Sequence, residues 1–127
     1  MSYVADIRVR YGEVDQQGVV FNAHYLAYLD DALDTWLREL DDDFESLGWD
    51  LMLKKAVLEW HSSAGTGDLL TVIAKVSRWG NTSFDVSFEI SSAVSLVLTA
   101  TITYVGVKPG TAEPVPPPAK VRSYLSR

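Results

Sequence analysis

The spacing of apolar residues changes from two to three or four and back to two along the chain. Residues 6–11 alternate apolar and polar positions, which is the pattern of a half-buried strand. In residues 23–40, leucines and tryptophan recur every three or four residues and form one apolar stripe. This pattern predicts an amphipathic helix of about 27 Å, with Asn22 as its N-cap.

The second half of the chain reads almost entirely as strand, after a weaker helical turn expected within residues 44–53. Turn signals at residues 65–68 and 80–81 separate consecutive runs, and such short reversals indicate antiparallel pairing. Strands are predicted over residues 56–64, 69–79, 83–91 and 96–107.

All five prolines lie in residues 109–118, so this segment is expected to be extended and outside the sheet. A short closing helix is expected over residues 119–125. The sequence therefore predicts a single α+β domain over residues 1–127, in which one long helix packs on a curved antiparallel sheet of about five strands. The last strand is apolar on both faces, which predicts contacts with a second subunit.

Composition narrows the class of protein. The chain has 47% apolar and 22% charged residues, typical of a globular domain. With no cysteine, there is no disulfide framework and no thiolate nucleophile. We see no secretory leader and no apolar run that could cross a bilayer, so a cytoplasmic protein without a membrane partner is expected.

The net charge of −6 is concentrated in residues 30–45, where eight acids face one base, Arg38. This surface would repel nucleic acid and is more typical of a solvated helix face than of a docking site. An anionic ligand would need local basic groups. The candidates are Lys54, Lys55, Arg78, Lys108, Lys120 and Arg122.

Asp15 is the leading candidate for chemistry. It stands in a glycine-flanked loop just before the long helix, where free N–H groups and the helix dipole can polarise a carbonyl oxygen. A carboxylate across from those donors could attack a carbonyl carbon or activate water. From spacing alone, the favoured interpretation of Asp15 is a turn residue that accepts backbone hydrogen bonds.

Residues 9–32, VRYGEVDQQGVVFNAHYLAYLDDA, resemble the signature of the 4-hydroxybenzoyl-CoA thioesterase-like hotdog proteins. The resemblance continues weakly through Glu59, residues 63–64, 68–69 and 80–83. It implies a hotdog fold and hydrolysis of an acyl-CoA thioester. It also implies a homodimer or a homotetramer built as a dimer of dimers, with the site between two subunits.

Carried over by position, the resemblance places the catalytic aspartate at Asp15, as nucleophile or general base. The backbone N–H at Asn22 would polarise the thioester carbonyl, and Gly18 would allow close approach of the backbone. Tyr25 and Tyr28 would help to wall the acyl pocket. The other substrate-binding candidates are Val20, Arg78, Thr82 and Ser83.

Several alternatives remain open at this level. Glu59 is a rival carboxylate, and His24 is either a ligand-facing group or a surface or capping residue. His61 reads as a packed or edge histidine; two histidines without a third ligand make a weak metal site, and no cofactor is expected. The chain has no Gly-x-Ser-x-Gly elbow, and Val20 stands where hotdog hydratases place a histidine. A non-catalytic acyl-CoA-binding or assembly protein and a thioesterase for carrier-protein-bound acyl groups are the rival functions.

Overall fold

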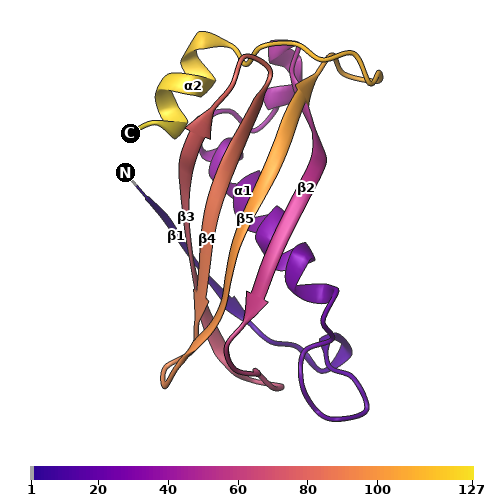
Figure 1. The fold of residues 1–127 in the computed structure, drawn as a ribbon, viewed down its shortest axis with the longest axis vertical. Coiled ribbons are helices and arrows are strands. Elements are labelled where there is room, and N and C mark those ends of the chain that lie inside the picture. The colour runs from indigo at the N-terminus through magenta and orange to yellow at the C-terminus, as the bar shows by residue number, and fades with distance from the viewer. Residues whose placement is uncertain (1) are drawn as a thin grey trace.

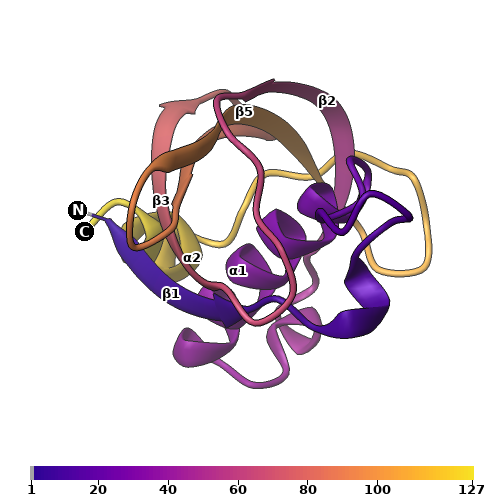
Figure 2. The ribbon, with the colours of Figure 1, turned by 90° about the horizontal axis from the view of Figure 1, so that it is seen from below.

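The computed structural model describes residues 2–127 as a long helix laid against one curved sheet. The five strands pair antiparallel in the order β1-β3-β4-β5-β2. Helix α1 (His24–Leu40) lies behind the sheet (Figure 1), and the view along the strands shows the sheet curving around it (Figure 2). The strands are β1 (Tyr3–Arg8), β2 (Asp50–Trp60), β3 (Leu69–Trp79), β4 (Ser83–Ser91) and β5 (Leu96–Val107).

The core lies between the apolar stripe of α1 and the concave face of the sheet. Leu29, Leu33 and Leu37 recur one helical turn apart and are almost completely buried. They meet the inward side chains of the central strands, which alternate with polar outward neighbours. On β4 these inward residues are Phe84, Val86, Phe88 and Ile90.

The predicted α+β hotdog architecture is confirmed. Strands β3, β4 and β5 have the predicted bounds, and the closing helix α2 (Ala119–Leu125) follows the proline-rich segment as expected. For β3 and β4, two-residue alternation explains this success, because it marks a strand with one buried face.

The predicted bounds of the first two strands were wrong. Strand β1 runs from Tyr3 to Arg8 instead of over residues 6–11, because its partner β3 begins at Leu69, opposite Arg8. Strand β2 begins at Asp50 instead of residue 56, and a bulge between Leu53 and Lys55 interrupts its alternation. The weaker helical turn expected within residues 44–53 is the 3-10 turn η2 (Phe44–Leu47), and residues 50–53 belong to β2.

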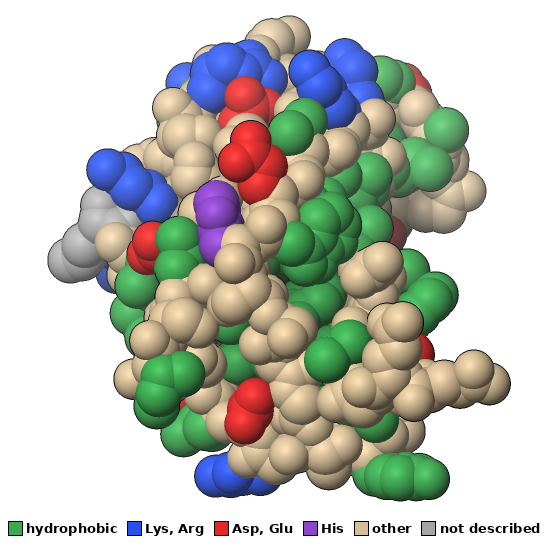
Figure 3. All heavy atoms as spheres, turned by 60° about the horizontal axis from the view of Figure 1, so that its bottom comes forward, with side chains coloured by type: hydrophobic (Ala, Val, Ile, Leu, Met, Phe, Trp, Pro, Cys, Tyr) green, Lys and Arg blue, Asp and Glu red, His purple; other side chains and the backbone are tan. Residues whose placement is uncertain are grey.

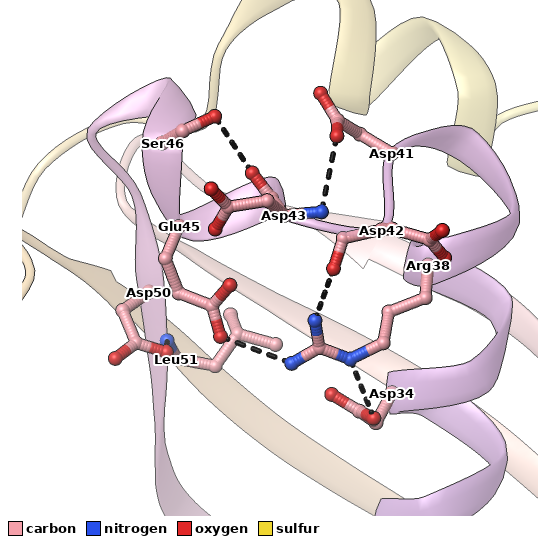
Figure 4. Close-up of polar contacts among 9 residues, drawn as sticks. All are labelled: Asp34, Arg38, Asp41, Asp42, Asp43, Glu45, Ser46, Asp50 and Leu51. Carbon is pink, nitrogen blue, oxygen red and sulfur yellow. Dashed lines mark hydrogen bonds and ion pairs between the residues drawn. The ribbon is translucent and has the colours of Figure 1, made fainter.

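The acidic segment after α1 is organised around Arg38 (Figure 4). The Arg38 guanidinium donates to Asp34 and Glu45, each at 3.0 Å, and also to the carbonyl of Asp42. Part of the acidic charge is therefore neutralised within the fold, at the end of α1 that lies far from its N-terminus. No helix within residues 2–127 is long and apolar enough to span a bilayer.

Candidate active site

Asp15 is carried by a short hairpin between the 3-10 turn η1 (Tyr11–Glu13) and α1. At its base the Phe21 N–H donates to the Glu13 carbonyl at 3.0 Å. Nearer the tip, the Asp15 N–H donates to the Val19 carbonyl at 2.9 Å and the Gly18 N–H donates to the Asp15 carbonyl at 3.0 Å. Gly18 has φ +79°, a left-handed conformation that favours glycine. A Cβ at Gly18 would meet nothing within 4 Å, so the left-handed turn is the reason for glycine that the fold itself supplies.

The Asp15 carboxylate is half-buried and only partly engaged. Its Oδ1 accepts the Gln17 N–H at 2.8 Å, which closes an Asx turn at the hairpin tip. Within residues 2–127, no hydrogen bond to Oδ2 is found. Asp15 therefore stabilises a turn, as one of the two sequence-based interpretations expects, and its Oδ2 has no hydrogen-bond partner among the described residues.

Helix α1 begins without a side-chain cap. Its N-cap is Ala23 and not Asn22 as predicted, because the His24 N–H already donates to the Phe21 carbonyl at 2.8 Å and closes a turn over residues 21–24. Alanine has no side-chain oxygen to satisfy the first N–H groups. The positive end of a 17-residue helix is thereby left open to an incoming acceptor.

A groove of about 310 Å³ lies beside this helix start. Figure 3 shows this end of the molecule, where hydrophobic side chains gather on the surface. The Trp60 ring, at the end of β2, packs edge-on against Tyr25 at 6.3 Å between centroids, yet Trp60 remains 47% exposed. The groove is lined by Val19, Val20, Asn22, Tyr25, Trp60, His61, Ser62 and Ser63.

A second cluster of polar side chains lies on the other side of the helix start, around Glu13. Its Oε2 accepts the Arg10 guanidinium at 2.7 Å and lies 2.9 Å from the His24 Nε2. Its Oε1 accepts the Arg10 N–H at 2.8 Å and the Tyr28 hydroxyl at 2.9 Å. The hydrogen bonds from Arg10, above all, lower the Glu13 pKa from 4.5 to about 2, against its burial, which raises it. Glu13 is therefore a carboxylate at neutral pH.

Sequence comparison assigns the family. A model of the thioesterase-like superfamily matches residues 9–125, which is most of the chain. The chain belongs to the thioesterase-like superfamily. The predicted hotdog thioesterase family is thus confirmed, and a thioesterase is the enzyme class that this membership supports. No protein of curated function is matched by the sequence.

Solved structures show the same thioesterase fold over nearly the whole chain. A 4-hydroxybenzoyl-CoA thioesterase from Pseudomonas is 18% identical with TM-score 0.87, covering 97% of this chain and 98% of that one. A 1,4-dihydroxy-2-naphthoyl-CoA thioesterase from Synechocystis is 23% identical with TM-score 0.86, covering 98% and 96%. A Staphylococcus aureus protein in complex with CoA is 14% identical with TM-score 0.87, covering 98% and 81%. At these identities the likeness establishes the fold.

Within this thioesterase fold, the predicted site residues fall into two groups. Val20, Asn22 and Tyr25 line the groove at the start of α1, whereas Asp15 and Gly18 lie on the hairpin that leads to it and are not among the residues that line the groove. The fold places Tyr28 apart from the groove, with its hydroxyl on Glu13, and burial raises the pKa of its phenol.

The second group lies at the other end of the strands. Arg78 is nine residues along β3 from Leu69, so at about 3.3 Å per residue the two ends are roughly 30 Å apart. There the Arg78 guanidinium donates to Asp85 at 2.9 Å and to Ser83 at 3.3 Å, and the Thr82 carbonyl accepts the Gly106 N–H. Within one chain, Arg78, Thr82 and Ser83 do not join the groove.

The remaining candidates have structural partners. His24 does not cap α1, since its ring reaches Glu13 instead. The His61 Nε2 lies 2.9 Å from the Thr99 hydroxyl, and Glu59 is exposed opposite Thr99 on the outer face of the sheet.

Sequence reasoning missed Glu13 and Trp60. An acid two residues before Asp15 was the one signal available for Glu13, and its partners lie up to fifteen residues away.

Proposed function

We propose that this protein hydrolyses acyl-CoA thioesters, with Asp15 as the reacting carboxylate. The observation that carries the proposal is that two features follow each other along the chain beside one groove. One is a hairpin whose Asp15 keeps Oδ2 without a partner among residues 2–127, and the other is a helix start without a side-chain cap, where Asn22 and Tyr25 line the groove. Membership of the thioesterase-like superfamily supports thioester chemistry. The solved relatives that act on or bind CoA compounds support CoA as the carrier.

In the proposed reaction, the thioester carbonyl oxygen accepts the backbone N–H at Asn22, close to the positive end of α1. Charge that develops on this oxygen is stabilised by donors already in place. Asp15 then attacks the carbonyl carbon to give a mixed anhydride, which water hydrolyses, or it removes a proton from an attacking water. In both routes the C–S bond breaks, CoA leaves as a thiolate and the free acid is released. A thiolate is a good leaving group and needs little acid assistance, so one carboxylate suffices.

A second subunit completes the site in this proposal. Strand β2 is an edge of the sheet and exposes Met52, Val57 and Trp60, between 47% and 51% of each side chain. An exposed apolar edge strand is a ready surface for pairing with another chain. If two β2 strands pair antiparallel, the end of one subunit that carries Arg78 would lie beside the end of the other subunit where α1 begins. Arg78, Thr82 and Ser83 of one chain would then approach the α1 N-terminus of its partner, where they could hold CoA.

The test is a thiol-release screen of the purified protein with short-chain, long-chain and aromatic acyl-CoAs. The proposal predicts continuous release of CoA thiol from at least one class. If no acyl-CoA is hydrolysed but an acyl group on a carrier protein is, the carrier-protein alternative replaces the CoA proposal. If neither is hydrolysed while acyl-CoA still binds, the chain is a binding protein.

The same substrate can distinguish direct attack by Asp15 from activation of water by Asp15. In a single turnover in heavy-oxygen water, attack by Asp15 would leave the label in its carboxylate after hydrolysis of the anhydride. Label in the product alone, together with no acylated Asp15 trapped by hydroxylamine, would indicate the general-base route, since water can also open the anhydride at its acyl carbon.

A further inference from the structure

Glu13 is the one charged side chain that is buried among residues 2–127, with 6% of its surface exposed. Burying a carboxylate costs free energy unless its oxygens find donors. Both oxygens of Glu13 meet this requirement, because each one is contacted by two different residues. The donors on Oε1 are the Arg10 N–H and the Tyr28 hydroxyl, and those on Oε2 are the Arg10 guanidinium and the His24 ring.

These partners belong to separate parts of the chain. Arg10 follows the end of β1, while His24 and Tyr28 lie one turn apart at the start of α1. The rings of His24 and Tyr28 also pack edge to face, 4.9 Å apart, which holds both donors toward the carboxylate. Glu13 therefore ties the exit of the sheet to the first two turns of the helix.

The main chain of the same residue closes the hairpin that carries Asp15. The Glu13 carbonyl accepts the Phe21 N–H, and Val14 pairs with Val20 in the next position. One residue thus fixes the base of the hairpin through its carbonyl and fixes the helix start through its side chain. The distance from Asp15 to the first amides of α1 depends on both attachments.

We propose that Glu13 is a positioning residue, whose buried carboxylate holds the Asp15 hairpin in register with the N-terminus of α1 so that the proposed carboxylate and carbonyl-binding amides face each other. This inference rests on the proposed function. A displacement of about 1 Å between reacting groups can cost about 100-fold in rate. The effect is expected on the chemical step, because Arg10, His24 and Tyr28 engage both Glu13 oxygens and leave neither for a bound substrate.

Glu13→Gln is the direct test, since it keeps the shape and removes the charge. Each carboxylate oxygen is surrounded by donors, so the amide NH₂ of glutamine must face an N–H or O–H group wherever it points. Loss of registry should lower kcat by about 10- to 100-fold with KM close to the wild-type value. It should also speed hydrogen exchange of the backbone amides in residues 14–22.

Glu45→Gln is the matched control. It also removes a carboxylate from an Arg–Glu pair, but at the far end of α1, where Arg38 keeps Asp34 and the Asp42 carbonyl (Figure 4). Its kcat and its exchange in residues 14–22 should match the wild type. If Glu13→Gln does not fold, Arg10→Gln serves instead, because the Arg10 side chain is 80% exposed and its removal still takes two donors from Glu13.

The outcomes separate this inference from the proposed function. Unchanged exchange in residues 14–22, or faster exchange with unchanged kcat, would overturn the positioning role. If Glu45→Gln lowers kcat as much as Glu13→Gln does, the positioning role is also overturned, because general destabilisation would then explain both losses. If the wild type hydrolyses no thioester but Glu13→Gln loosens residues 14–22 selectively, the hairpin attachment stands and the hydrolase proposal fails.

Discussion

Two carboxylates two residues apart have opposite environments at the start of α1. Glu13 is buried and has all its oxygens engaged by the protein, while Asp15 is half-buried and keeps Oδ2 for another partner. The position of Asp15 could be predicted because it follows from a local motif. The role of Glu13 could not, because Arg10, His24 and Tyr28 surround it only once β1, η1 and α1 have packed, and the 3-10 turn erases any simple periodicity.

The lowered pKa of Glu13 predicts how the free energy of unfolding changes in acid. Because the folded-state pKa of Glu13 is lowered from 4.5 to about 2, its carboxylate contributes fully to the free energy of unfolding above about pH 4.5. That contribution is lost as the pH falls through about 2. Urea unfolding of Glu13→Gln should therefore show a weaker fall in stability over this range than the wild type. Parallel pH profiles for the two proteins would contradict the assigned environment.

Among the elements, β3, β4 and β5 were predicted to the residue, whereas the bounds of β1 and β2 were not. After Asp50, strand β2 continues with three consecutive apolar residues (Leu51, Met52 and Leu53), and the bulge between Leu53 and Lys55 follows, so the pattern has no period of two where the strand begins. The same irregular strand is the exposed edge of the sheet. The missing cap of α1 also escaped prediction, because Asn22 is a good capping residue by type and only the turn at residues 21–24 removes it from that position.

The exposed edge strand β2 is predicted to be the contact between two subunits. Replacing Met52 and Val57 together with lysine should block pairing of two β2 strands, since charged edges resist association. Both side chains are about half exposed, so the fold itself should tolerate the change. Sedimentation should then detect monomers in place of dimers, with loss of thioester hydrolysis. Val4→Lys, on the opposite edge strand β1 and 57% exposed, is the control that should leave assembly unchanged. An unaltered assembly in the double variant would place the subunit contact elsewhere.

For the whole molecule, hydrophobic patterning was sufficient to predict one helix packed on one antiparallel sheet, because burying each apolar face leaves few arrangements. It could not place Arg78, Thr82 and Ser83, which lie at the far end of the strands from Asp15. Their distance becomes meaningful only when a second copy is considered. In the proposed pairing of two β2 strands, a second subunit would help to close the groove, so the residues of one chain alone do not specify the acyl group.

The proposed chemistry requires the Asp15 carboxylate, and measuring both acyl-CoA binding and turnover of the Asp15→Asn variant tests this directly. An asparagine Oδ1 can keep the hydrogen bond from the Gln17 N–H, so folding and acyl-CoA binding should be retained. Turnover of the acyl-CoA found in the screen should fall by about 100-fold or more, as expected for loss of a nucleophile or general base. Turnover close to the wild type, with binding intact, would contradict the assignment of Asp15 as the reacting carboxylate.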